Sequence, residues 1–298
     1  MKIAAVVVTF NRSALLIECL QGLVSQTRRV DKIFVLDNCS SDDTPQRMAS
    51  FCTDHPQVAY RRLDSNTGGA GGFAQAMQWA WSEGFDWLWL MDDDVEPYPE
   101  GLQNLLAFSD RSRCIHGVRT EPDGEAFPWG SQFVEAVVDT VALPQPLPQQ
   151  PGAAIEINVG CFEGMLVHRD VISQIGFPWP ELFITWDDTY FGFCASKVTP
   201  VLYARVNSLK RKRTMDRVAA GILGTKMSMT AMGNFYHHRN RYMLATRLQP
   251  APFRFWVRNA WVYGKSMAKE LLLRRDWANA RSIHQGTCAG LMFYRQAK

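Results

Sequence analysis

Short apolar runs alternate with helix-like patterns at the start of the chain, and this alternation limits the fold more than any other feature. The runs Ile3–Val8, Ile33–Leu36 and Val58–Arg62 have the composition of buried β-strands. Apolar residues recur at helical spacing between the first two runs, and Pro45 suits the first turn of a second helix. The order strand, helix, strand, helix, strand predicts an α/β fold with a mostly parallel sheet and helices on both faces.

A fourth apolar run, Trp87–Met91, ends in the triple carboxylate Asp92-Asp93-Asp94. Open α/β sheets bind ligands at the carboxyl ends of their strands, which is where this triplet would lie. Adjacent carboxylates repel one another unless a cation is present, and Mg²⁺ and Mn²⁺ prefer oxygen ligands. The pattern therefore predicts a nucleotide held through a metal ion. An acidic surface loop after a strand explains the triplet equally well when it is taken alone.

Four glycines stand within five positions in the stretch Asn66-Thr67-Gly68-Gly69-Ala70-Gly71-Gly72. Glycines allow close backbone approach, and we expect them to lead into a helix, Phe73–Ser82, whose first amides face a phosphate or a sugar. No Lys-Ser/Thr pair follows the glycines, and they follow the third strand rather than the first, so neither common nucleotide-binding loop fits. A helix packed tightly on a sheet is the alternative.

A second carboxylate pair, Asp187-Asp188, follows the apolar segment Leu182–Trp186 and begins a predicted helix, Asp188–Ser196. The helix dipole favours an ionised carboxylate at this end, as a general base requires. A simple helix cap is the alternative interpretation.

The composition is that of a globular protein: 47% of the 298 residues are hydrophobic and 20% are charged. The net charge is only +3, and we expect no nucleic-acid partner. Seven cysteines without a C-x-x-C pair indicate reduced thiols in a cytoplasmic protein. The start of the chain is too short for a signal peptide, and no run has the apolar length of a membrane span. Any membrane contact is therefore expected to be peripheral.

The last ninety residues are rich in basic side chains. The run Lys210–Arg213 is expected to be a solvated surface, and helical patterns with interleaved aromatic and basic residues follow from Phe253. Such helices suit an anionic membrane surface or an ordinary bundle with a basic outer face, and a second copy of the chain is a further possible partner. We expect two domains, residues 1–208 with the site and a mostly helical, basic region over residues 209–298.

The order of these motifs resembles that of the inverting family 2 glycosyltransferases, which have a GT-A fold. The motifs are Thr9-Phe10-Asn11-Arg12 after the first strand, the acidic turn from Asp37, the glycine-rich stretch, the acidic triplet and Trp186-Asp187-Asp188. The likeness covers roughly residues 3–205. Within that family the glycine-rich stretch with Met91–Val95 looks most like the galactofuranosyltransferases of bacterial polysaccharide synthesis. The related rhamnosyltransferases share most of these motifs and their order.

The resemblance implies a role for each matching position. The implied nucleotide contacts are Thr9, Asn11, Arg12 and Asp37. The implied sugar and phosphate contacts are Asn66, Gly68, Gly69, Gly71, Gly72, Asp93 and Trp186. Asp92 and Asp94 are implied to bracket Mn²⁺ or Mg²⁺. Asp188 is implied to be the general base, with Asp187 supporting it. Family members often have a further histidine ligand about twenty residues beyond the base, where this chain has none. His237 or His238 could replace it, or both could lie on a helix that faces the acceptor.

The implied reaction transfers galactofuranose from UDP-galactofuranose, with metal assistance and inversion. The implied acceptor is a growing bacterial surface polysaccharide, such as an O-antigen or capsule, or a lipid-linked glycan. The implied location is the cytoplasm or the inner face of the plasma membrane. A rhamnosyltransferase using dTDP-rhamnose, or a non-catalytic glycan-binding partner of a synthase complex, is the alternative.

Overall fold

The structure, a computed structural model, describes residues 1–127, 131–143, 149–213, 217–219, 225–227 and 229–297. Contacts divide the chain into two compact units, which we name the sheet unit and the helical unit. The sheet unit consists of Met1–Ser131, Leu143–Glu181 and Asp187–Thr214, and the helical unit of Gln132–Ala142, Leu182–Trp186 and Met215–Lys298. The expected boundary after residue 208 falls inside a strand of the sheet unit, and the helical unit includes two segments that precede this boundary.

Four parallel strands form one half of the large sheet, in the order β3-β2-β1-β4. They are β1 (Ile3–Thr9), β2 (Lys32–Asp37), β3 (Val58–Arg62) and β4 (Trp87–Asp92), where the apolar runs predicted them. Every residue of β1 is buried, because helices cover both faces of the sheet. The register places Thr9 beside Asp37 and Val8 beside Asp92. The polar residues that follow the strands therefore meet at one edge of the sheet.

The other half of the sheet is mixed and continues from β4 in the order β10-β6-β11-β5, with β9 paired to β11. These strands are β5 (Val95–Pro97), β6 (Cys114–Thr120), β9 (Ala154–Ile157), β10 (Leu166–His168) and β11 (Val201–Arg211). Only β6 and β11 run parallel to each other, and the remaining pairs are antiparallel. The predicted α/β class is confirmed. The sequence pattern did not predict β6 or β11.

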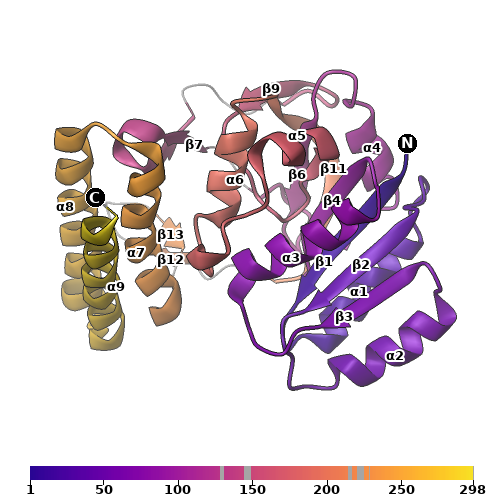
Figure 1. Cartoon of the computed structure of the whole chain (residues 1–298), viewed down its shortest axis with the longest axis horizontal. Coiled ribbons are helices and arrows are strands. Elements are labelled where there is room, and N and C mark those ends of the chain that lie inside the picture. Colours follow the sequence, from indigo (N-terminus) through magenta and orange to yellow (C-terminus); the bar gives the residue numbers. More distant parts are fainter. Residues whose placement is uncertain (128–130, 144–148, 214–216, 220–224, 228, 298) are drawn as a thin grey trace. The chain divides into compact units, whose positions relative to one another are not determined.

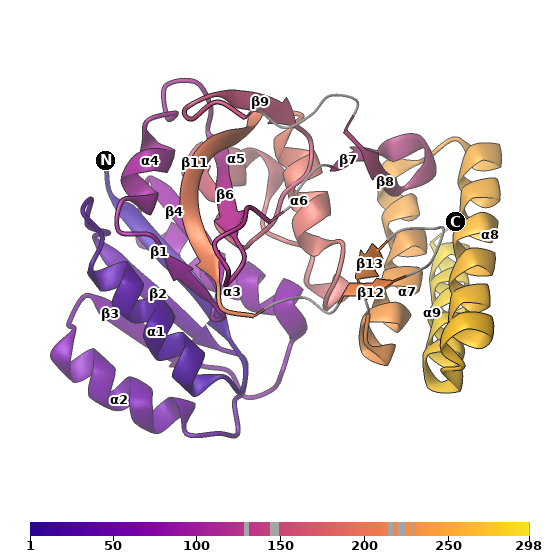
Figure 2. The ribbon, with the colours of Figure 1, turned by 180° about the vertical axis from the view of Figure 1, so that it is seen from behind.

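Helices cover both faces of this sheet. Helices α1 (Ser13–Val24), α2 (Thr44–Asp54) and α4 (Gly101–Leu106) lie on the face seen in Figure 2. Helices α3 (Gly68–Ser82), α5 (Arg169–Ile175) and α6 (Asp187–Ala195) lie on the face seen in Figure 1, and the short 3₁₀ turn Pro180–Leu182 precedes α6. Helix α3 was expected to begin at Phe73, but it begins at Gly68, so the glycines form its first turns.

The helical unit contains the predicted C-terminal helices. These are α7 (Ala231–Leu248), α8 (Pro252–Ala268), a π-helical segment (Lys269–Arg274) and α9 (Trp277–Gln296). The unit also holds the hairpin β7 (Ser131–Val134) and β8 (Asp139–Ala142), joined by a 3₁₀ turn (Glu135–Val137), and the pair β12 (Arg217–Ala219) and β13 (Thr225–Met227). Helices α7 and α9 pack closely, since a Cβ at Gly286 would lie 2.1 Å from the carbonyl oxygen of Phe235.

The segment Leu182–Trp186 of the helical unit has an unusual backbone. Phe183, Thr185 and Trp186 have φ angles of 64°, 65° and 70°, which non-glycine residues seldom adopt. The Nδ2 amide of Asn240, on α7, donates to the carbonyl oxygens of Leu182, Ile184 and Thr185 at 2.8–3.0 Å. These hydrogen bonds offset the strain of a segment that leads directly into Asp187.

A buried ion pair ties the hairpin of the helical unit to its helices. The Arg241 side chain is 1% exposed, and its Nη1 lies 2.9 Å from Oδ1 of Asp139. Arg258 donates from Nε to the other Asp139 oxygen at 2.6 Å. Burial alone would raise the pKa of Asp139, but the charges of Arg241 and Arg258 lower it below its ordinary value. The carboxylate therefore stabilises the fold above its unfolded pKa, and this contribution is lost as the pH falls through the lowered folded pKa.

Asp139→Asn should lower the free energy of unfolding by about 3–5 kcal/mol, because it leaves the Arg241 charge buried without its counter-charge. Urea unfolding monitored by circular dichroism measures the change. Arg47→Gln is the matched control, since the Arg47–Asp43 pair is exposed and should contribute less than about 1 kcal/mol. Equal effects of the two substitutions would contradict a structural role for the buried pair.

Candidate active site

The acidic triplet after β4 divides into two parts. The side chain of Asp93 is buried and accepts hydrogen bonds from the Thr9 hydroxyl at 2.7 Å and the Arg12 guanidinium at 2.9 Å. The backbone amide of Phe10 adds a third, at 3.3 Å. Arg12 also donates to Asp94 at 2.9 Å. Asp93 therefore fixes the end of β1, and the donor contacts expected of Thr9 and Asp93 stay predictions.

Asp92 and Asp94 lie together with a third acid, Glu163. Each of the three offers a carboxylate oxygen, and these oxygens all lie within 4.8 Å of one another; no other such group occurs among the described residues. Burial, followed by the charges of Glu163 and the neighbouring aspartates, raises the pKa of Asp92 well above its ordinary value. A divalent cation would relieve this repulsion, and an all-oxygen donor set is what Mg²⁺ and Mn²⁺ prefer. The cluster therefore fits the predicted metal ion.

Sequence reasoning missed Glu163 because its place depends on a long-range strand pairing. Strand β10 pairs with β4, and the amide of Gly164 donates to the carbonyl oxygen of Leu90 at 2.8 Å. This pairing sets Glu163 beside the end of β4. The only local signal was an acid within the small-residue turn from Gly160 to Gly164.

Two buried arginines hold Glu163 in place. Arg119 bonds to its Oε2, and Nε of Arg211 lies 3.3 Å from the same oxygen. The two guanidinium groups lie 4.7 Å and 4.5 Å from the centre of the Phe127 ring. The expectation that Lys210–Arg213 is a solvated run was wrong for Arg211, which is buried because β11 extends to this residue. Because both arginines are buried away from water, they require the negative charge of the Glu163 carboxylate beside them.

The predicted nucleotide contacts Asn11 and Asp37 organise the turn after β2. Asp37 is fully buried and accepts hydrogen bonds from the Tyr60 hydroxyl at 2.6 Å and the Ser40 amide at 2.7 Å. Asn11, with a φ of 55°, accepts from the Ser41 amide at 2.6 Å. These bonds shape the edge of the sheet, and the nucleotide contacts stay predictions.

Two asparagines shape the start of α3. Asn66 accepts from the amide of Gly68 at 2.8 Å. Asn38, at the end of β2, donates to the carbonyl oxygen of Gly68 at 2.9 Å and accepts from the amide of Thr67 at 2.8 Å. The helix N-terminus is therefore fastened to the edge of the sheet that carries the triplet.

The glycines of α3 allow close approach on two sides. A Cβ at Gly71 would lie 2.6 Å from Cβ of Thr67, and one at Gly72 would lie 2.7 Å from Cγ1 of Val8 on β1. A Cβ at Gly69 would lie 3.8 Å from Oδ2 of Asp187. The first turn of α3 therefore brings the second carboxylate pair to the same region as the strand ends.

Asp187 and Asp188 begin α6 and have different surroundings. Burial, followed by the charge of Asp188, raises the pKa of Asp187 to about 8. Burial also raises the pKa of Asp188, but hydrogen bonds from Thr189 and the charge of Arg119 oppose this rise. The backbone amide of Thr189 donates to Asp188 at 2.6 Å. The hydrogen bonds from Thr189 and the charge of Arg119 therefore favour the charged form of Asp188 more than that of Asp187.

Helix α6 packs closely against the turn that contains Glu163, through a contact between two glycines. A Cβ at Gly192 would lie 1.9 Å from the backbone nitrogen of Gly160, which leaves no room for a side chain. Gly192→Ala should therefore lower the free energy of unfolding by about 3 kcal/mol. Gly264→Ala, in the exposed face of α8 with nothing near the added Cβ, should stabilise by about 1 kcal/mol. Chemical unfolding of both variants checks the contrast, and similar stabilities would contradict the close packing.

Trp186, His237 and His238 belong to the helical unit. The Trp186 indole donates to the carbonyl oxygen of His237 at 3.1 Å, and the two rings lie 5.1 Å apart. Burial lowers the pKa of His237 to about 3 and that of His238 to about 4, so both imidazoles are neutral. The carboxylate cluster belongs to the sheet unit, and the metal-ligand role of either histidine and the donor contact of Trp186 stay predictions.

Comparisons with known proteins identify the family of the chain. A sequence profile described as Glycosyl transferase family 2 matches residues 4–176. The chain is 28% identical over 312 residues to galactofuranosyltransferase GlfT1 of Mycolicibacterium smegmatis, covering 94% of this chain and 95% of the relative. It is 33% identical over 198 residues to GlfT1 of Mycobacterium tuberculosis, covering 62% of this chain and 61% of that relative.

Solved structures share the fold at low sequence identity. The structure of S. aureus TarS 1-349 has a TM-score of 0.60 at 15% identity and covers 100% of this chain and 90% of its own. The structure of GalNAc-T7 with UDP, GalNAc and Mn²⁺ has a TM-score of 0.56 at 13% identity and covers 70% of this chain and 44% of its own. These likenesses confirm the predicted architecture.

Proposed function

Because the chain belongs to glycosyl transferase family 2, we propose that it transfers galactofuranose from UDP-galactofuranose with inversion and with help from a divalent cation. One observation carries the proposal. The sheet unit contains a three-carboxylate cluster at the end of β4 and a separate buried carboxylate pair, whose first member lies near Gly69 in the first turn of α3. The likeness to two GlfT1 proteins supports galactofuranose as the sugar.

The donor half of the site consists of the cluster, Arg12 and the start of α3. Asp92, Asp94 and Glu163 would hold Mn²⁺ or Mg²⁺, which when bound neutralises charge on the departing nucleoside diphosphate. Arg12 is partly exposed beside Asp94 and offers a further positive charge for the diphosphate. The dipole of α3 adds a partial positive charge at its N-terminus, which favours an anion there.

The acceptor half is the pair Asp187–Asp188. Inversion needs a single displacement, with one base on the side opposite the leaving group and no covalent nucleophile. Asp188, whose charged form is supported by Thr189 and Arg119, takes the proton from the attacking acceptor hydroxyl. Asp187, which holds a proton near neutral pH, donates a hydrogen bond to the acceptor and so orients it. We propose a glycan or lipid-linked glycan as the acceptor.

A panel of nucleotide sugars tests the proposal. The protein is incubated with Mn²⁺ and UDP-galactofuranose, UDP-galactopyranose or dTDP-rhamnose, and nucleotide release is followed with and without a glycan acceptor. Release from UDP-galactofuranose alone is the expected result. Release from dTDP-rhamnose alone would show that dTDP-rhamnose, and not UDP-galactofuranose, is the donor, and the proposed mechanism would still apply. Absence of release from every donor would refute the transferase activity and favour a glycan-binding role.

A further inference from the structure

Helix α8 and the π-helical segment expose large apolar side chains. Phe253 is 80% exposed, Trp261 is 60% exposed and Leu272 is 75% exposed. We name the α8 face as the set Phe253, Val257, Trp261, Leu272, Leu273 and Trp277, each of which is at least half exposed. Exposed apolar patches of this kind mark interaction sites. In the described part of the chain, no helix is long and apolar enough to cross a membrane.

The apolar residues of α8 share one side of the helix, because Phe253, Val257 and Trp261 follow at intervals of four. A row of basic residues lies alongside it, at Arg254, Arg258, Lys265 and Lys269. Arg258 bonds to Asp139 and Lys269 lies 3.5 Å from Glu270. Arg254 and Lys265 have no acidic partner among the described residues, so their charges remain available to an anionic ligand.

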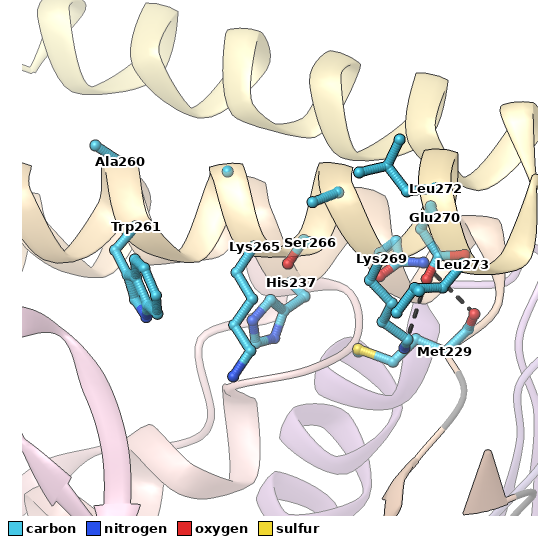
Figure 3. Close-up of a pocket in the computed structure, with 13 residues that line it drawn as sticks. Met229, His237, Ala260, Trp261, Lys265, Ser266, Lys269, Glu270, Leu272 and Leu273 are labelled. Atoms are coloured by element: carbon cyan, nitrogen blue, oxygen red, sulfur yellow. Dashed lines mark hydrogen bonds and ion pairs between the residues drawn. The ribbon is translucent and has the colours of Figure 1, made fainter. Parts of the chain in front are cut away.

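A groove of about 620 Å³ opens beside the α8 face, within the helical unit. Figure 3 shows Trp261 and Lys265 pointing to the same side of α8, with Leu273 farther along that side. Leu272 also lines the groove. Apart from Glu270, which is 2% exposed, every ionisable residue that lines the groove is basic or histidine. The groove therefore combines an apolar lining with positive charge at Lys265 and Lys269.

We propose that the α8 face docks onto the surface of an anionic phospholipid bilayer. Trp261, Leu272 and Leu273 enter the boundary between headgroups and acyl chains, and Arg254 and Lys265 contact lipid phosphates. Tryptophan favours this boundary because its ring is apolar and its N–H needs a polar partner. The docking does not depend on which donor the sheet unit binds.

Charge favours lipid over a second copy of the chain. Residues 229–297 contain eleven Arg and Lys but only two acids, Glu270 and Asp276. Glu270 is buried beside Arg274, and Asp276 caps α9 through the Asn279 amide. A two-fold dimer would set the same basic patch against itself, and neither acid of the described residues 229–297 is free to pair it. An anionic bilayer supplies the missing negative charge.

Vesicle flotation of the full chain tests this surface. We expect binding to vesicles of phosphatidylcholine with phosphatidylglycerol, little binding to phosphatidylcholine alone, and weaker binding as salt is raised. Arg254→Glu with Lys265→Glu should weaken vesicle binding at least about 25-fold, since each basic side chain contributes about fivefold to the affinity. Trp261→Ser with Leu272→Ser should also release the protein from the vesicles.

Met292→Ser with Arg295→Glu is the matched control, because both residues are exposed on α9 outside the α8 face. This variant should bind vesicles like the unchanged protein, and circular dichroism checks that all variants fold. Failure to bind anionic vesicles would overturn the proposal, as would equal losses in the control. Dimerisation in sedimentation that Trp261→Ser abolishes, without vesicle binding, would assign the face to a second copy.

Discussion

Asp188→Asn should lower kcat for sugar transfer by about 10²–10⁴-fold, the usual contribution of a general base. The amide keeps the shape of the side chain but cannot accept the acceptor proton. Metal-dependent donor binding and the unfolding midpoint should stay near those of the unchanged protein, because the carboxylate cluster is a separate group of residues. Transfer kinetics and titration of UDP in the presence of Mn²⁺ measure the two effects independently.

Asp187→Asn is the matched control. Since Asp187 already holds a proton near neutral pH, the amide resembles its working form, and we expect a loss of less than about tenfold. The pH profile gives a second check. The pKa of Asp188 is raised, so kcat should fall as the pH drops through a value above the ordinary aspartate range. Retained turnover in Asp188→Asn with loss in Asp187→Asn would reverse the two roles.

Asp94→Asn should lower kcat/KM by about 10²–10³-fold and abolish the dependence of donor binding on Mn²⁺, because a ligand that lets the cation neutralise the leaving group is lost. Calorimetric titration with Mn²⁺ and thermal unfolding with and without the ion measure the loss directly. The unchanged protein should be stabilised by Mn²⁺, since the ion relieves repulsion among Asp92, Asp94 and Glu163. An unaltered Mn²⁺ affinity in Asp94→Asn would contradict the site.

Glu163→Gln distinguishes a ligand from a structural anchor. As a ligand, Glu163 contributes to Mn²⁺ affinity; as an anchor for Arg119 and Arg211, it contributes only to stability. Glu121→Gln provides the comparison, because Glu121 lies 3.5 Å from Arg211 but is not part of the cluster. We expect Mn²⁺ affinity to fall in Glu163→Gln alone. Equal Mn²⁺ affinities in the two variants would show that Glu163 is not a metal ligand and only anchors Arg119 and Arg211.

Local patterns were enough to predict the first half of the sheet. The runs that became β1 to β4 are short and continuously apolar, and the carboxylates after β4 could be placed at the strand ends from chain order alone. The start of α3 was placed too late because glycine has low helix propensity, whereas the fastening by Asn38 and Asn66 overrides it.

Features that depend on distant pairing could not be found in this way. Strand β11 contributes Arg211 to the site only because it continues through a basic run that looks like a surface. Glu163 reaches the cluster through the pairing of β10 with β4, which no local pattern encodes. The charge that opposes the rise in the pKa of Asp188 likewise comes from Arg119, which is distant in sequence.

The strained segment before Asp187 depends on a side chain of the helical unit for its backbone conformation. Left-handed backbone at Phe183, Thr185 and Trp186 needs outside support, and Asn240 of α7 supplies it. A chain that lacked α7 would keep the strands and acids of the cluster but lose the hydrogen bonds that hold the segment before Asp187. The sheet unit thus contains the whole carboxylate cluster, whereas the backbone that leads into Asp187 depends on the helical unit as well.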